Sequence, residues 1–303
     1  MTSPLEQFAA PGTLRPGLWR LVVGVAIILL IWVLWTAAVL AAVALVNLAS
    51  GMSVDDALTA MQAQIGSGEP LGVILTLLTF AGIWPGTWAA LRLMHAQRFA
   101  TLLSPTGLMR WSEFGTGLLL AVGFWLLTLA FGMALAGAPA RSDLPLGLWL
   151  AALSPLAVLV FFQASGEELI FRGYILQQLA SRYRSPMIWA FLPSFLFGLL
   201  HYSGGAGLGI GWHYVAVTTL FGLAAAAMVW RTGSLALAMG MHTGMNMFSL
   251  SVVGIDGIID GTQLFIYDGA SARVLFLTDG TATAILLAFV LSPYFPLGRR
   301  ATA

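Results

Sequence analysis

The chain has 303 residues, of which 59% are hydrophobic and only 8% are charged. Because soluble globular domains carry about 25% charged residues, this composition excludes an ordinary soluble domain and indicates a multi-pass membrane protein. The formal net charge of +1 excludes nucleic-acid binding based on bulk charge, and the absence of cysteine excludes disulfides, thiolate metal sites and a cysteine nucleophile.

Eight apolar runs approach or exceed the roughly 20 helical residues needed to cross a bilayer core of about 30 Å. We place them at Leu21–Ala49, Leu71–Leu91, Gly115–Ala136, Pro145–Gln163, Pro186–Tyr202, His213–Trp230, Ser234–Val253 and Ala282–Leu297. The first run is too long for a signal peptide and is expected to be retained. The sequence therefore predicts an all-α fold, a polytopic membrane helix bundle with about eight transmembrane helices. No internal repeat or linker divides residues 1–303, so we expect a single transmembrane domain.

The arginine residues orient these helices, since cytoplasmic loops are enriched in Lys and Arg. With the N-terminus inside and the helices alternating, the inner segments receive Arg15, Arg20, Arg92, Arg98, Arg110, Arg182, Arg184, Arg231, Arg299 and Arg300. The outer segments receive only Arg141 and Arg273, while Arg172 lies inside the membrane. We therefore expect a multi-pass protein of the cell (inner) membrane, embedded in the lipid bilayer, with cytoplasmic N- and C-termini.

Three segments between the spans have their own patterns. Residues 53–65 begin with a serine followed by two aspartates, which predicts an N-capped helix on the outer surface. The outer segment 254–281 is rich in Gly and Asp, and we expect a short hairpin with strands near Leu264–Tyr267 and Val274–Leu277. Residues 203–211 contain five glycines, which predicts a flexible connection rather than a helix.

The most unusual stretch holds two adjacent carboxylates, Glu167 and Glu168, inside the apolar run 145–184. A charged residue at the centre of a transmembrane helix costs about 2.5–3.5 kcal/mol on insertion scales, so such residues are rare and usually functional. Arg172 follows Glu168 by four residues, the spacing at which a carboxylate and a guanidinium pair on a helix. Glu167 is rotated from Glu168 by about 100°, so we expect it to stay available for chemistry.

Length makes the depth of these glutamates ambiguous. Residues 145–184 would span about 60 Å as one helix, so the helix is expected either to protrude from the bilayer or to break near Pro155 or Ser165-Gly166. We expect the glutamates in the cytoplasmic half, with a cavity open to the cytoplasm that supplies water.

Polar residues on two other helices are predicted to meet the glutamates. Glu168 precedes Arg184 by 16 residues and His201 follows it by 17, so both reach a similar depth in an antiparallel pair. His242 and Asn246 are four apart and share one face of the seventh helix. The alternative is structural: a carboxylate–arginine network and interhelical hydrogen bonds that only hold the bundle together.

Three motifs in this order resemble the CPBP intramembrane proteases, the family of the type II CAAX prenyl endopeptidases and of bacterial proteins linked to bacteriocin processing and immunity. The motifs are Glu167-Glu168-x-x-x-Arg172, Phe197-x-x-x-His201 and His242-x-x-x-Asn246, the last preceded by Arg231-Thr232-Gly233-Ser234-Leu235. The resemblance covers about a third of the chain, from Ala157 to Leu250, and implies a protease-like core over residues 145–253.

The resemblance also implies roles for the site residues. Glu167 would be the general base that activates water, assisted by His201, while His242 and Asn246 would stabilise the oxyanion of the tetrahedral intermediate. Glu168 and Arg172 complete the implied catalytic set. The implied partner is a membrane-associated protein or peptide substrate, with or without a lipid. No feature of the sequence indicates an oligomeric state.

Metal use stays open at this point. Zinc takes three protein ligands in catalytic sites, and Glu167, His201 and His242 would supply them from three different spans. The sequence has no HExxH helix, so a metal-free glutamate peptidase fits equally well. No other cofactor is expected.

Two other functions compete with an endopeptidase. A non-catalytic membrane immunity or scaffold protein would keep the fold and act by binding alone. A proton- or ion-coupled transporter would use the acids and histidines as a relay. The absence of internal repeats and of further acids in the other spans counts against the transporter. We also expect His95 to lie solvated in a cytoplasmic loop.

Overall fold

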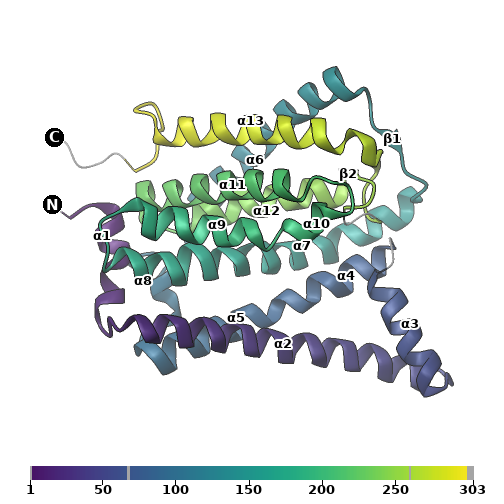
Figure 1. Cartoon of the computed structure of the whole chain (residues 1–303), viewed down its shortest axis with the longest axis horizontal. Coiled ribbons are helices and arrows are strands. Elements are labelled where there is room, and N and C mark those ends of the chain that lie inside the picture. Colours follow the sequence, from purple (N-terminus) through teal and green to yellow (C-terminus); the bar gives the residue numbers. More distant parts are fainter. Residues whose placement is uncertain (1, 67–68, 259–260, 299–303) are drawn as a thin grey trace.

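The computed structural model describes residues 2–66, 69–258 and 261–298, and nearly every element in them is a helix. Within these residues, six helical segments are long and apolar enough to cross a membrane: Leu18–Ala49, Pro70–His95, Trp111–Ala136, Leu146–Ala180, Gly211–Thr232 and Gly269–Leu291. The long helices lie beside one another along one common direction (Figure 1). The predicted all-α, polytopic membrane helix bundle is therefore confirmed.

In chain order the helices and strands are α1 Pro4–Ala9, α2 Leu18–Ala49, α3 Val54–Gly66, α4 Pro70–Thr79, α5 Ile83–Ala90, α6 Trp111–Ala136, β1 Ala140–Arg141, α7 Leu146–Glu168, α8 Leu176–Ala180, α9 Leu192–Leu199, α10 Tyr202–Ala206, α11 Gly211–Thr232, α12 Ala236–Ser251, β2 Val253–Ile255, β3 Phe265–Tyr267 and α13 Ala272–Leu291.

Two of the eight predicted spans are helical but short. The fifth is the 13-residue helix Met187–Leu199, formed by a π-helical turn and α9. The seventh is α12, with 16 residues. The count of eight spans therefore stays a prediction.

The helix that carries the glutamates does not break. α7 continues past Pro155 and Gly166 into a π-helical segment, Leu169–Ile175, and then into α8, so that Leu146–Ala180 forms one helical run of 35 residues. Of the two expected outcomes, interruption near Pro155 or Ser165-Gly166 was wrong. The π-helical segment begins directly after Glu168. Such segments are rare and often mark functional sites, because they change which way the following side chains face.

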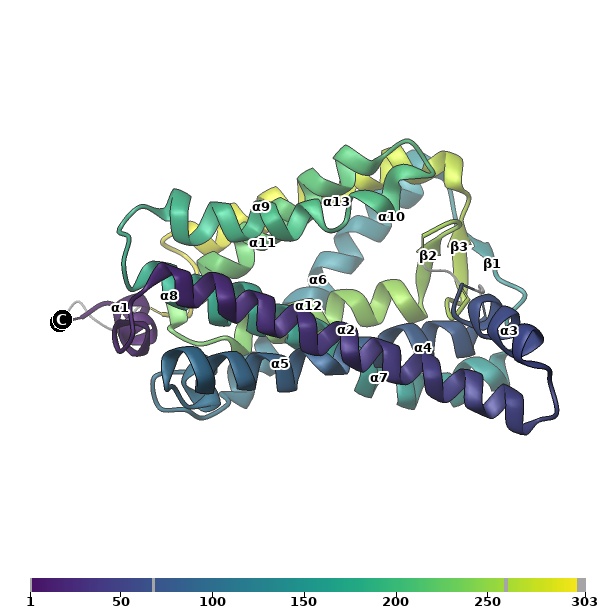
Figure 2. The same ribbon diagram turned by 60° about the horizontal axis from the view of Figure 1, so that its bottom comes forward.

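In the described part of the chain, the arginine-bearing turns that we predicted to be cytoplasmic gather at one end of the bundle, while Arg299 and Arg300 lie outside the described residues. α1, α8 and the last turn of α13 lie at this end, whereas α3, α10 and the strands lie at the other (Figures 1 and 2). The N-terminal segment is fixed there, because the Gln177 Nε2 amide donates to the carbonyls of Phe8 and Thr101, each at 2.9 Å. Which end faces the cytoplasm stays a prediction.

His95 lies in this arginine-rich end, and the expectation that it is solvated was wrong. Its side chain is fully buried, and its Nε2 lies 2.7 Å from the hydroxyl of Tyr174. His95 ends the π-helical turn Leu91–His95 that continues α5, so a residue that we expected in a loop is buried at the end of a helix.

At the opposite end, the structure corrects two expectations. α13 begins ten residues earlier than the predicted span, so Val274–Leu277 is helical and not a hairpin strand. Its apolar residues Leu275 and Phe276 are buried, and burying them favours the helix over an exposed hairpin. β3 instead pairs with β1 in antiparallel and with β2 in parallel register. The glycine-rich connection also contains a short helix, α10, where no helix was expected.

The helix predicted over residues 53–65 is confirmed as α3, which begins at Val54, and its location on the outer surface stays a prediction. The Ser53 hydroxyl accepts a hydrogen bond from the backbone N–H of Asp56 at 3.2 Å, the capping arrangement that the sequence predicted.

Small residues let α6 and α12 pack closely. A Cβ added at Gly240 would collide with the carbonyl oxygen of Phe114, and one at Gly117 would lie 2.6 Å from the backbone nitrogen of Met241. Close backbone approach at glycine is a general way to associate helices in membranes, where the hydrophobic effect does not drive them together. This contact fixes the position of α12, which carries His242 and Asn246.

We predict that Gly240→Ala destabilises the protein by about 1–3 kcal/mol, the usual cost of overpacking a well-packed core. Gly123→Ala on α6 is the matched control, since no atom lies within 4 Å of a Cβ built at Gly123. Denaturant unfolding of both variants in detergent measures the difference. Equal stability of the two variants would contradict the close packing.

Candidate active site

Glu168 is the most deeply buried acid of the site, with no exposed surface. Its Oε1 accepts a hydrogen bond from the Arg172 NH1 group at 3.0 Å and lies 2.8 Å from His242 Nδ1. The predicted pair between Glu168 and Arg172 therefore forms, and it extends to a histidine on α12. A carboxylate without surface exposure needs such partners, because an isolated buried charge is strongly unfavourable.

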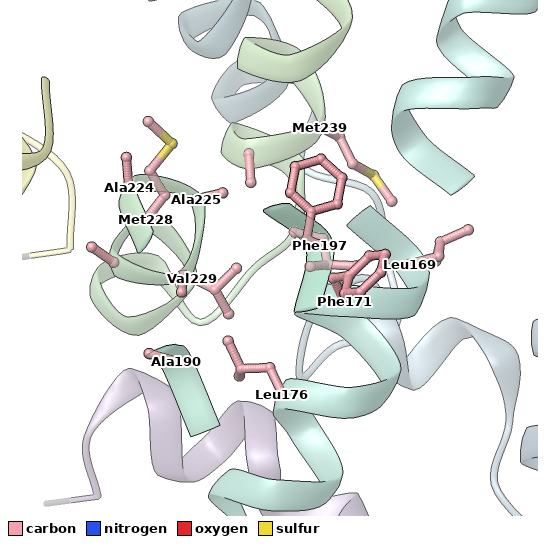
Figure 3. Close-up of a cluster of buried hydrophobic side chains, with 14 of the residues drawn as sticks. Leu169, Phe171, Leu176, Ala190, Phe197, Ala224, Ala225, Met228, Val229 and Met239 are labelled. Atoms are coloured by element: carbon pink, nitrogen blue, oxygen red, sulfur yellow. The ribbon is translucent and has the colours of Figure 1, made fainter. Parts of the chain in front are cut away.

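Arg172 is held among aromatic rings. Its guanidinium carbon lies 4.5 Å from the ring centre of Phe197, and the rings of Phe221 and Phe171 are 5.7 and 5.9 Å away. Figure 3 shows Phe171 and Phe197 coming from two different helices into the same apolar cluster. Cation–π contacts of this kind offset part of the cost of burying the guanidinium. Gly222 on α11 completes the pocket, since a Cβ there would approach the Arg172 NH2 group to 2.6 Å.

Glu167 differs from its neighbour, as the helical rotation predicted. Its side chain is 12% exposed, against 0% for Glu168, and it forms no ion pair with an arginine in the described part of the chain. Its Oε2 lies 3.5 Å from His242 Nε2 and has no hydrogen-bond partner among the described residues. His242 thus lies between the two glutamates, with one ring nitrogen toward each of them.

His201 follows the end of α9, and its tautomer can be inferred. Its Nδ1 lies 2.9 Å from the backbone carbonyl of Phe197. A carbonyl oxygen can only accept a hydrogen bond, so Nδ1 carries the proton and Nε2 of the neutral ring is an acceptor. Phe197 packs against the His201 ring at 4.6 Å, and Tyr214 packs at 5.4 Å. Phe197 therefore packs directly against the His201 ring.

Asn246 lies one turn beyond His242 on α12. Its Nδ2 donates to the Oε1 of Gln163 on α7 at 2.8 Å. The sequence analysis missed Gln163, although its spacing was informative. It precedes Glu167 by four residues and therefore shares a helix face with it.

A cavity of about 830 Å³ brings the free groups together. Its wall includes Glu167, His201, His242 and Asn246, together with Gln163. Glu168 and Arg172 do not line it and lie behind this wall. Most of the remaining lining is apolar and comes from α2, α4, α6, α9, α11, α12 and α13. The predicted convergence of residues from three spans on one cavity with room for water is therefore present.

The extent of the cavity differs from two expectations of the sequence analysis. It extends to Val253 and Tyr267 at the strand-bearing end, so its wall does not support the expected opening toward the cytoplasm. It is also lined by Asp279, which the sequence analysis assigned to an outer loop but which lies within α13. The expectation that the spans outside the site carry no further acid was therefore wrong.

Zinc was one expectation for this site. Over the residues that the structure describes, no group of three or more His, Asp or Glu side chains is arranged to hold a metal ion. Both ring nitrogens of His242 instead face glutamate oxygens. Zinc ligation by Glu167, His201 and His242 therefore does not fit this arrangement.

The fold and the cavity are those of a multi-pass membrane protein with a polar site inside its helix bundle. Residues 147–248 match the family described as type II CAAX prenyl endopeptidase Rce1-like, a family of peptidases. The match includes all six predicted site residues, and it confirms the resemblance seen in the motifs.

A bacterial protein is also similar to part of the chain. The chain is similar to the uncharacterized protein YyaK of Bacillus subtilis (strain 168), at 27% identity over 169 residues. The match covers 54% of this chain and 55% of YyaK, so it spans about half the length of that relative. No solved structure matches the chain.

The two glutamates should respond differently to loss of charge. We predict that Glu168→Gln lowers the free energy of unfolding by about 3–5 kcal/mol, because it leaves the Arg172 charge buried without its carboxylate. Glu167→Gln should cost much less, since Glu167 contacts no arginine. Denaturant unfolding in detergent compares the two variants. The double variant Glu168→Gln/Arg172→Met, which has neither charge, should recover much of the loss. Similar stability of the two single variants would contradict the division of roles.

Proposed function

We propose that the chain is an intramembrane endopeptidase. It would hydrolyse a peptide bond of a membrane-associated protein or peptide, with or without a lipid anchor. The observation that carries this proposal is the placement of Glu167. It lies on the cavity wall beside an imidazole and has an unpartnered carboxylate oxygen, while Glu168 holds the buried charges behind it.

In the proposed reaction, Glu167 takes a proton from a water molecule, and the water oxygen attacks the carbonyl carbon of the scissile bond. The Nε2 of His201 accepts a hydrogen bond from the same water and orients it. A carboxylate can act as general base when it lies within hydrogen-bond reach of the water that it deprotonates. Glu167 then returns the proton to the leaving nitrogen, and the C–N bond breaks.

His242 and Asn246 would stabilise the negative oxygen of the tetrahedral intermediate. The Nδ1 of His242 is held by Glu168, so a protonated ring presents Nε2–H to the cavity. Asn246 has two N–H groups, and Gln163 accepts only one of them. Removing one such donor typically costs a factor of about 10²–10³ in rate. Glu168 and Arg172 act as positioning residues, because they orient His242 without reaching the cavity.

The family match supports peptide hydrolysis as the class of reaction, over the part of the chain that carries these residues. It does not identify a substrate for this chain, and the Bacillus relative is uncharacterized. The proposal therefore rests on the arrangement of the side chains.

We predict that Glu167→Gln lowers cleavage of membrane peptides by about 10²–10⁴-fold, the typical contribution of a general base, while the protein stays folded. Comparative peptidomics of proteoliposomes or cells measures the loss. Glu113→Gln is the matched control, since Glu113 on α6 pairs with Arg110, which precedes the helix, and neither residue lines the cavity. Full activity of Glu167→Gln would remove this mechanism. A phenotype that survives both Glu167→Gln and His201→Ala would favour the immunity or scaffold function instead.

We further propose that the reaction needs no zinc, because no three His, Asp or Glu side chains among the described residues are arranged to hold a metal ion. Purified protein should contain zinc well below one atom per chain by elemental analysis, and chelators should leave cleavage unchanged. Stoichiometric zinc that is lost in His201→Ala would contradict this prediction and support the metallopeptidase alternative.

A further inference from the structure

Asp279 is an acid in a membrane-spanning helix that the proposed mechanism does not use. It lies within α13 and lines the same cavity as Glu167 and His201. Among the described residues its carboxylate has no hydrogen bond or ion pair with another side chain, in contrast to Glu168. Acids in membrane spans usually pair with a cation or serve a function.

The geometry of α13 turns Asp279 toward the site. Leu275, Phe276, Asp279 and Thr283 all line the cavity, and their spacing places them on one face of the helix. The ring of Phe276 packs against Tyr214 at 4.7 Å, and Tyr214 packs against His201 at 5.4 Å. Tyr214 lies within electrostatic reach of both Asp279 and Glu167. Asp279 and the site residues therefore face one continuous space from different helices.

The charge at the neighbouring end of the bundle has the same sign. Among the described residues, the acids in or beside the elements of the strand-bearing end are Asp55 and Asp56 in α3, Glu69 before α4, Asp143 after β1, Asp256 after β2 and Asp268 after β3. The described arginines in these elements are Arg141 in β1 and Arg273 in α13. A surface and a cavity that share one sign of charge attract ligands of the opposite sign. The apolar wall around Asp279 makes a pairing there stronger than in water.

We propose that Asp279 is a specificity-determining residue that selects peptides with a cationic side chain, Lys or Arg, at a position removed from the scissile bond. The cation would lie against Asp279 on α13 while the scissile carbonyl lies at Glu167 on α7. This inference deepens the proposed endopeptidase function and rests on it for the position of the scissile bond. The class of ligand follows from Asp279 itself: an apolar segment that carries one positive charge.

The test uses the full chain in lipid nanodiscs and a set of fluorescence-quenched apolar peptides. In each peptide one position carries either Arg or citrulline, which has the same shape without the charge. Both the dissociation constant and the cleavage rate are measured for each pair. Asp279→Asn is the test variant. Asp256→Asn is the matched control, because it removes the same charge from an exposed residue near the same end that does not line the cavity.

Wild type should bind the Arg peptide about tenfold more tightly than the citrulline peptide at one position, as expected for a charge-assisted hydrogen bond. Asp279→Asn should bring this ratio close to one, Asp279→Glu should keep a preference, and Asp256→Asn should leave it unchanged. The inference is overturned if wild type shows no preference at any position, which is the result expected of a neutral, structural Asp279. It is also overturned if Asp279→Asn keeps the preference. Absence of cleavage by wild type would count against the endopeptidase, while the ratio of dissociation constants still decides the role of Asp279.

Discussion

The site depends on one carboxylate with two partners. The Oε1 of Glu168 is shared between Arg172, one turn along its own helix, and His242 on α12. Neither the acid nor the arginine is exposed, so each charge is tolerated only because the other is present. This three-residue contact joins the two helices that carry the site and fixes the orientation of the His242 ring. Arg172 pairs with Glu168 and packs against the surrounding rings, while Glu167 faces the cavity.

Backbone features elsewhere position this contact. Glycine at 117 and 240 allows α12 to lie directly against α6, and glycine at 222 leaves room for the guanidinium beside α11. The π-helical segment begins at the residue after Glu168 and shifts the direction of Arg172 and Tyr174 relative to a regular helix. Arg172 thereby enters the aromatic cluster, and Tyr174 reaches the buried His95 at the arginine-rich end.

The sequence predicted the membrane class, the helical fold, the positions of most long helices and the separate environments of the two glutamates. These features follow from local rules, namely run length and helical spacing. It failed where distant segments decide the structure. The local sequence around Leu275 and Phe276 is typical of a strand, but these residues are helical because they pack against other helices. The same error placed Asp279 in an outer loop instead of in α13. Gln163 lies four residues before Glu167 and so shares its helix face. Its pairing with Asn246 depends on how α12 is positioned against α7, which the local sequence does not show. His95 is buried by a fold of the chain that local composition cannot show.

The helix that ends near His201, Met187–Leu199, is short for a membrane span. Its 13 residues rise only about 20 Å, well below the roughly 30 Å of a hydrocarbon core. A bilayer adapts to a short apolar segment by thinning beside it. The lipid next to α9 would then be depressed toward His201, so that water comes close to the cavity that His201 lines. In the proposed hydrolysis, the thinned membrane as well as the protein would bring water to the site.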